Sequence, residues 1–307
     1  MTTPRKGLQR YSPDIEPDVF EFQRVAYPER DPALLAPRWR WMFVESAARQ
    51  GVEPQVWTYF RKGELVAHQG AIPVTCKVGE REHETGWFVE TMVLEKVRSG
   101  PVGATLVAKA LEDMPFNLSL GQSPVMRELQ FRLGWKKIGP LNTWVLVVDP
   151  GRVAAARSPG ERLLLGAALP AWSVLCRLRR RSVASGALDV REVADFGDPH
   201  DALWERVAGH YRCAVRRDAG FLRWKFVLQP GQVFHRHEVV GNGSVRGVMA
   251  CRVRGPGGDY PYERLEITEL LAAPADREAL FALFDRAAEL AREKGIPLVY
   301  LHVSHPV

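Results

Sequence analysis

Residues 87–104, WFVETMVLEKVRSGPVGA, indicate the architecture of this chain. The segment begins like a strand and ends in a loop with Gly100 and Gly103 that opens an apolar helix. Such a junction gathers unpaired backbone N–H groups at the positive end of the helix, where they can hold a pyrophosphate, and glycines allow its close approach. The expected donors, which together we call the cradle, are the backbone amides of Ser99, Gly100, Val102, Gly103 and Ala104.

The residues around this segment predict a first unit that spans 1–150. Apolar spacings of three and four indicate helices, and alternating runs separated by short polar turns indicate an antiparallel meander of strands. The expected elements are two helices within 17–50, strands at 55–60, at 65–78 and through Leu94, a helix after Gly100, a strand at 116–120, a helix at 124–133 and a strand pair at 135–148.

Residues 191–307 repeat part of this plan. The expected elements are a helix at 203–211, strands at 233–240, 245–254 and 264–271, a helix at 276–294 and a strand at 298–303. The halves therefore look like diverged copies, but the second lacks the helix and strand pair that close the first. Either it is trimmed, or something else covers its open edge. Its junction at 271–276 has no glycine, so a second phosphate cradle is not expected.

Residues 151–190 form the expected connector, an apolar stretch followed by an arginine cluster at 177–181. Such a segment can rest on an anionic membrane surface, or it can be an interdomain helix with a solvated basic end. We favour the interdomain helix, because Pro170 interrupts the apolar run. The predicted fold class is α/β, of the α+β type, with two units that each contain a mostly antiparallel twisted sheet flanked by helices.

Composition limits the classes of partner. Lys and Arg total 42 against 36 Asp and Glu, giving a net charge of +6, but the arginines are scattered and no nucleic-acid-binding motif accompanies them. A phosphate-bearing small molecule fits this charge better than a nucleic acid. The four cysteines have no CxxC spacing, so no metal is expected. The N-terminus has no apolar signal core, which predicts a cytoplasmic protein.

Two motifs resemble the GCN5-related N-acetyltransferase (GNAT) superfamily. The stretch 98–103, RSGPVG, is similar to its acyl-CoA-binding motif, with Pro101 at the middle glycine position. The stretch 130–139, QFRLGWKKIG, is similar to its Tyr-x-x-x-Gly-Phe segment, with Gln130 at the tyrosine. The order of elements from residue 19 to 148 also matches, and tandem arrangements are known in the superfamily.

The resemblance implies roles for particular residues. The strand with Val93 and Leu94 would be splayed from its neighbour, and its free backbone groups would pair with the pantetheine arm of acetyl-CoA or another acyl-CoA. Arg98 and the cradle would bind the same cofactor. Amides near Val93 would polarise the thioester carbonyl. Glu90 matches the position of the base that deprotonates the amine, with a pKa raised by partial burial. The alternative is that Glu90 only solvates the strand edge or pairs with an arginine. Ser123 would bond the pantetheine or phosphate, or cap the following helix.

We therefore expect an acyl-CoA-dependent N-acyltransferase acting on a small-molecule or polymer-borne amine, with the second half shaping the acceptor site. The alternative is a non-catalytic acyl-CoA-binding or scaffold module, which the departures at Pro101 and Gln130 favour. His68, on the central strand, either faces the acceptor or is a satisfied structural residue, and we favour the latter. The unfinished second unit is compatible with a homo-oligomer.

Overall fold

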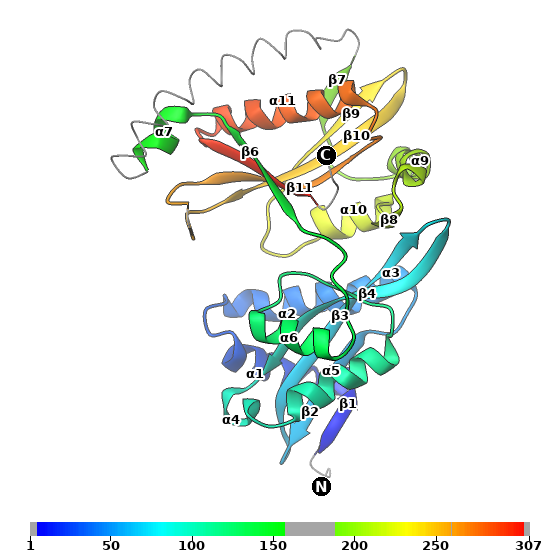
Figure 1. Ribbon diagram of the computed structural model, residues 1–307, viewed down its shortest axis with the longest axis vertical. Helices are drawn as coiled ribbons and strands as arrows, with labels where there is room; N and C mark the ends of the chain where they lie inside the picture. The colour runs from blue at the N-terminus through cyan, green and yellow to red at the C-terminus, as the bar shows by residue number, and fades with distance from the viewer. Residues whose placement is uncertain (1–4, 157–187, 259, 304–307) are drawn as a thin grey trace. The chain divides into compact units, whose positions relative to one another are not determined.

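The computed structural model describes residues 5–156, 188–258 and 260–303, which fold as two compact units (Figure 1). The first unit contains Met1–Lys137, Tyr211–Arg216 and Leu228–Gly231, and the second contains Ile138–His210, Arg217–Val227 and Gln232–Val307. The apolar and arginine-rich parts of the expected connector lie outside the described residues. Within the described residues, no helix is both long enough and apolar enough to cross a membrane.

The first unit is built on a sheet with the strand order β1-β2-β3-β4-β5, and β8 pairs with the end of β3. The strands are β1 (Gly7–Arg10), β2 (Gln55–Arg61), β3 (Glu64–Val78), β4 (Arg81–Val93), β5 (Leu118–Ser119) and β8 (Cys213–Val215). Strands β2, β3 and β4 form the predicted antiparallel meander, whereas β5 runs parallel to β4.

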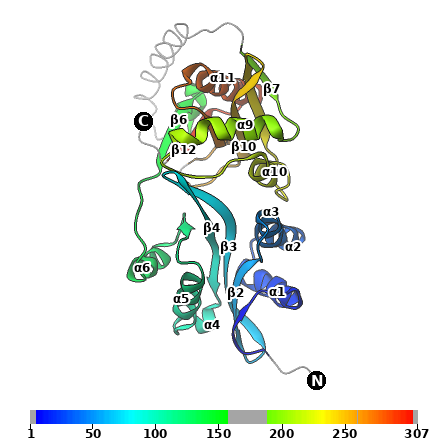
Figure 2. The same ribbon diagram turned by 90° about the vertical axis from the view of Figure 1, so that its right-hand side faces the viewer.

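Helices cover both faces of this sheet, with α1–α3 on one face and α4–α6 on the other (Figure 2). Their bounds are η1 (Pro13–Ile15), α1 (Glu16–Ala26), α2 (Pro32–Arg40), η2 (Trp41–Glu45), α3 (Ser46–Gln50), α4 (Glu95–Arg98), α5 (Val102–Asp113) and α6 (Pro124–Arg132). Helix α5 packs through Leu106 and Ala110, which share one helical face, against Trp57 and Phe88 of the sheet. This packing fixes the start of α5 beside the end of β4.

The second unit is built on a sheet with the strand order β6-β12-β11-β10-β9-β7. The strands are β6 (Asn142–Val147), β7 (Asp189–Glu192), β9 (His235–Gly241), β10 (Ser244–Arg254), β11 (Arg264–Ala272) and β12 (Leu298–Val303). The helices are α7 (Pro150–Ala155), α9 (Asp198–Val207), η4 (Ala208–His210), α10 (Ala219–Phe226) and α11 (Arg277–Glu293). Helix α11 lies along the sheet (Figure 1), burying Leu283, Ala287 and Leu290 at spacings of four and three.

The structure differs from the prediction at the end of the first unit, where β6 lies. The strand pair predicted at 135–148 is a single strand, and it pairs antiparallel with β12, from Val147 opposite Leu298 to Asn142 opposite Val303. An uncovered sheet edge leaves backbone N–H and C=O groups unpaired, and β6 satisfies those of β12. The open edge of the second unit is therefore covered by chain that precedes it in the sequence, which was one of the two expected explanations.

Candidate active site

The splayed edge of β4 is the first feature of the candidate site. Strand β4 pairs with β5 at only two positions, Trp87 with Leu118 and Phe88 with Ser119. Strand β5 then ends, whereas β4 continues to Val93. Residues 89–93 therefore have no strand partner on this side among the residues that the structure describes. An extended ligand can add to such an edge through main-chain hydrogen bonds.

The backbone of Val93 faces this edge. The N–H of the next residue, Leu94, donates to the carbonyl of Val66 on β3 at 2.9 Å. Because successive residues of a strand direct their main-chain groups to opposite sides, the N–H and C=O of Val93 point away from β3. The C=O accepts hydrogen bonds from Nε and Nη2 of Arg98 at 3.2 and 3.1 Å. Its N–H points to the same side, where β5 has already ended and no other described strand pairs with β4.

The loop between α4 and α5 is the second feature. The amides of Ser99 and Gly100 both donate to the carbonyl of Val97, so two of the five expected cradle donors are already used. The remaining three belong to residues of the first turn of α5, and they have no acceptor within the described ranges. These three donors are the amides of Val102, Gly103 and Ala104. The cradle is therefore smaller than expected, and among the described residues it is open to solvent, since 98–101 and Ala104 are exposed.

The local structure explains why glycine stands at 103 and proline at 101. A Cβ at Gly103 would lie 3.1 Å from Cγ2 of Val93, so glycine allows the first turn of α5 to approach the end of β4. Pro101 is the N-cap of α5, and its carbonyl accepts the first helical bond from Thr105 at 2.9 Å. The imino acid therefore ends the cradle at Val102 and leaves the three free amides in place.

A bulge in β4 is the third feature. Glu90 and Thr91 together lie opposite the single residue Gln69 of β3, and Glu90 has a φ of 55°. This conformation is strained for a residue with a Cβ. Nδ1 of His68 bonds the carbonyl of Glu90 at 3.0 Å, and Nε1 of Trp39 donates to Nε2 of the same ring at 3.1 Å. His68 is completely buried, and both of its ring nitrogens are used, so it is a structural residue that holds the bulge.

The carboxylate of Glu90 is paired with two arginines. Arg30 donates two hydrogen bonds to it at 2.7 and 3.0 Å, and Nη1 of Arg38 lies 3.3 Å from Oε1. Burial alone would raise the pKa of Glu90, but the hydrogen bonds from Arg30 and the charges of both arginines lower it below its ordinary value. The expected raised pKa is therefore wrong, and the alternative of an arginine pair is confirmed. The role of Glu90 as a base stays a prediction.

The residues that surround Glu90 were not predicted from the sequence. Arg30 follows α1, Arg38 lies in α2, and the guanidinium of Arg30 stacks on the ring of Tyr27, 3.5 Å from its centre. Burial, and then the charge of Glu90, raise the pKa of Tyr27, so its phenol stays protonated. No motif links these positions, because only the packing of α1 and α2 on the sheet brings them to β4.

The second unit contains a matching bulge. Strand β11 has one extra residue, Thr268, next to Glu269 and at the place where it leaves β12. Glu269 is buried, and it pairs with Arg217 at 2.8 Å and with Lys225 at 3.6 Å. Each unit therefore holds a glutamate at the bulge of its splayed strand between two cations. This recurrence supports the view that the halves are diverged copies, and it associates the ion pair with the fold.

The start of α11 differs from the start of α5. Asp276 caps α11, accepting a hydrogen bond from the amide of Ala279 at 3.1 Å. The guanidinium of Arg246 bonds the same carboxylate at 2.8 and 2.6 Å. A carboxylate therefore already occupies the positive end of this helix, where a phosphate would otherwise bind. This geometry agrees with the expectation that only the first unit has a cradle.

Three further residues follow the cradle along the chain. Ser123 caps α6, accepting a hydrogen bond from the amide of Met126 at 3.2 Å, as the alternative for this residue predicted. Gln130 is buried and donates to Oγ of Ser119 at 3.1 Å. The ring of Trp135 packs edge-on against Phe88, 5.5 Å between centres, and its buried Nε1 has no partner in the described residues. Trp135 thus offers a donor where β4 and β5 separate.

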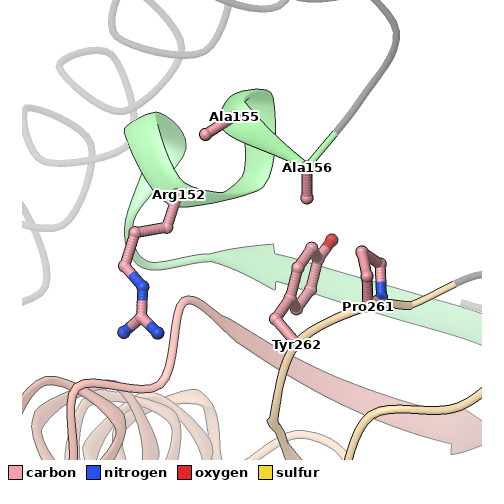
Figure 3. Close-up of a pocket in the computed structure, with 5 residues that line it drawn as sticks. All are labelled: Arg152, Ala155, Ala156, Pro261 and Tyr262. Carbon is pink, nitrogen blue, oxygen red and sulfur yellow. The ribbon is translucent and has the colours of Figure 1, made fainter.

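A separate open pocket belongs to the second unit (Figure 3). Helix α7 contributes Arg152 and Ala155, which are followed by Ala156, and the opposite wall is Pro261 and Tyr262. None of the expected site residues lines it. Among the described residues, no group of three or more His, Cys, Asp or Glu side chains is placed to hold a metal ion.

Solved structures share this fold across nearly the whole chain. No protein-family model and no curated protein matches the sequence. A GCN5-related N-acetyltransferase from Anabaena variabilis is similar with a TM-score of 0.66 and 11% identity, covering 98% of this chain and 66% of that one. A probable N-acyltransferase from Enterococcus faecalis gives 0.68 and 10%, covering 99% and 66%. Saccharomyces cerevisiae N-myristoyltransferase with bound myristoyl-CoA gives 0.56 and 13%, covering 98% and 78%.

These similarities confirm the fold that the sequence predicted. The chain has the GNAT fold in a tandem arrangement, with two sheets flanked by helices. It spans about two thirds of the length of the first two of these structures. At such low identity the similarity establishes the fold, and the chemistry has to be argued from the site itself.

Proposed function

We propose that this chain is an acyl-CoA-dependent N-acyltransferase, and that its first unit binds acetyl-CoA or another acyl-CoA. The observation that carries the proposal is the set of three unpaired amides of Val102, Gly103 and Ala104 at the start of α5. They lie beside the free edge of β4, because Gly103 packs against Val93. A pyrophosphate bound at these amides would direct the attached arm along this edge.

The edge supplies what acyl transfer requires. The pantetheine arm would pair with the free main-chain groups of residues 89–93, and the N–H of Val93 would stabilise negative charge on the thioester oxygen. The amine nitrogen attacks the carbonyl carbon, the C–S bond breaks, and CoA leaves as the thiolate. Glu90, which is ionised at neutral pH, is the candidate to accept the proton of the amine. Gln130 cannot protonate the thiolate, which would therefore leave without protein assistance.

The second candidate is a non-catalytic acyl-CoA-binding module. The ion pairs of Glu90 favour it, because a carboxylate held by two guanidinium groups is a weak base. Both candidates bind acyl-CoA at the cradle, and they differ only in whether the acyl group is then transferred to an amine.

Two measurements separate the candidates. Calorimetric titration with acetyl-CoA tests the cradle, and release of free CoA thiol in the presence of a panel of primary amines tests transfer. Binding with amine-dependent thiol release supports the transferase. Binding without release for every amine supports the module, and absence of binding rejects both.

A further inference from the structure

We propose that the amine acceptor carries an anionic group, such as a carboxylate, and that this group binds to Arg38 beside the bulge of β4. The inference rests on the proposed function, because it names the class of acceptor that the same site would take. Four observations carry it: the charge of the cluster around Glu90, the unused donors of Arg38, an unpaired amide of Gln23, and the place of the cluster beside the free edge.

The cluster carries more positive than negative charge. Arg30 and Arg38 contribute two positive charges, and Glu90 contributes one negative charge that lies between them. Tyr27 stays neutral, because its pKa is raised, and buried His68 is also neutral, because burial lowers its pKa. One positive charge therefore remains unbalanced within the cluster, which favours an anionic ligand over a neutral or cationic one.

The unused donors belong mainly to Arg38. Arg30 is fully engaged, since it bonds both oxygens of Glu90, donates to Oε1 of Gln23 at 3.1 Å and stacks on Tyr27. Arg38 makes a single contact, 3.3 Å from Oε1 of Glu90, and its other N–H groups have no acceptor in the described residues. Its side chain is 36% exposed, so solutes can reach it. A guanidinium with free, planar donors is well suited to a carboxylate.

Gln23 provides the independent observation. The residue is 2% exposed, and its Nε2 is buried with no hydrogen-bond partner among the described residues. Its Oε1 accepts from Arg30, which places this amide in the same cluster. A buried donor without an acceptor is costly, by about 1–3 kcal/mol, so the polar groups around Arg30 are incompletely satisfied.

The cluster around Glu90 lies next to the place where the reaction is proposed to occur. Glu90 lies in the stretch 89–93, whose edge faces no strand in the described parts of the chain and where the acyl thioester is proposed to lie. The carboxylate of Glu90 is held by Arg30, which follows α1, and by Arg38 of α2. Both helices cover the same face of the sheet (Figure 2). An acceptor anchored at Arg38 would therefore bring its amine toward the bulge, beside Glu90. A purely cationic amine would be repelled by the same arginines.

The test compares two matched ligands, aminohexanoate and its primary amide, which differ only in the charge remote from the amine. Their binding is measured by calorimetry on the full chain, with and without CoA. We expect the wild type to bind aminohexanoate about tenfold more tightly than the amide, which corresponds to about 1.4 kcal/mol. Arg38→Gln should remove most of this preference, and Arg38→Lys should retain part of it. Arg24→Gln is the control, because Arg24 is exposed on α1 and pairs with Glu21.

The outcomes distinguish this inference from the proposed function. Equal binding of both ligands by the wild type, or a preference that survives in Arg38→Gln, would overturn the anionic acceptor even if acetyl-CoA binds and is turned over. A failure of acetyl-CoA to bind would overturn the proposed function, whatever the amines do. In transfer assays the preference should appear in KM, with kcat similar for the two amines.

Discussion

The side chain of Arg98 donates two hydrogen bonds to the carbonyl oxygen of Val93, at 3.2 and 3.1 Å. This carbonyl is on the free edge of β4, where the pantetheine arm of acyl-CoA is proposed to pair. Arg98 is the last residue of α4, directly before the cradle, so it is close enough in sequence to bind the phosphates instead. The ligand and Arg98 thus compete for the same carbonyl.

Arg98→Ala should affect the two ends of the ligand differently. Acetyl-CoA is expected to bind up to about fivefold more weakly, as loss of one exposed charge contact predicts. S-acetylpantetheine has no pyrophosphate, and it should bind at least as tightly as to the wild type, because the carbonyl of Val93 is no longer occupied. Competition titrations with both ligands measure this. Equal weakening of both would show that Arg98 does not compete at Val93.

Glu90→Gln should destabilise the first unit and change its response to pH. Removing the charge leaves Arg30 and Arg38 without their carboxylate, at a cost of about 1–3 kcal/mol. The folded-state pKa of Glu90 lies below its ordinary value of 4.5, so its stabilisation is present above that pH and is lost as the pH falls through the folded-state value.

Urea unfolding at a series of pH values measures this difference. The gap in unfolding free energy between the wild type and Glu90→Gln should be largest near neutral pH and shrink under acid conditions. A gap that is constant with pH would contradict the ion-pair account. The same variant tests the base, since full transfer activity in it would remove Glu90 from the mechanism.

Gly70→Ala should destabilise the protein more than Gly100→Ala. A Cβ at Gly70 would lie 2.2 Å from Cε1 of Phe43, which is buried and cannot move freely, so we expect a loss of about 2–3 kcal/mol. A Cβ at Gly100 would lie 3.4 Å from the nearest atom, which is ordinary contact. Denaturant midpoints of the two variants provide the comparison. Similar midpoints would mean that the core beside the bulge adapts to the added methyl group.

The sequence predicted most of the fold because its signals are local. The meander from β2 to β4 and helix α11 appear as alternation and as a spacing of three and four residues, and both are close to their expected bounds. The partner of β6 was not predictable in this way. Its residues read as a strand, but pairing with β12 brings together segments more than 150 residues apart. Short edge strands such as β1 and β8 carry too few residues for a pattern.

The backbone part of the site, the cradle, was largely predictable from the sequence. The side chains that reach the site from other elements were not. The glycines and the strand-to-helix junction predicted five free amides. Those of Val102, Gly103 and Ala104 are free, whereas those of Ser99 and Gly100 are used. The pKa of Glu90 could not be predicted, because Arg30, which follows α1, and Arg38 of α2 reach it only once these helices pack on the sheet. Burial alone predicts a raised pKa, and the two arginines reverse that direction.

Ala104→Asp tests whether the amides at the start of α5 bind the pyrophosphate of acyl-CoA. Ala104 is exposed, and an aspartate in the first turn favours the helix through its dipole while it repels phosphate from the free amides, much as Asp276 occupies the start of α11. Calorimetric titration with acetyl-CoA should show binding to the wild type and a loss of at least about tenfold, or about 1.4 kcal/mol, in the variant, with unfolding stability unchanged or raised. Equal affinity of the two proteins for acetyl-CoA would contradict the account.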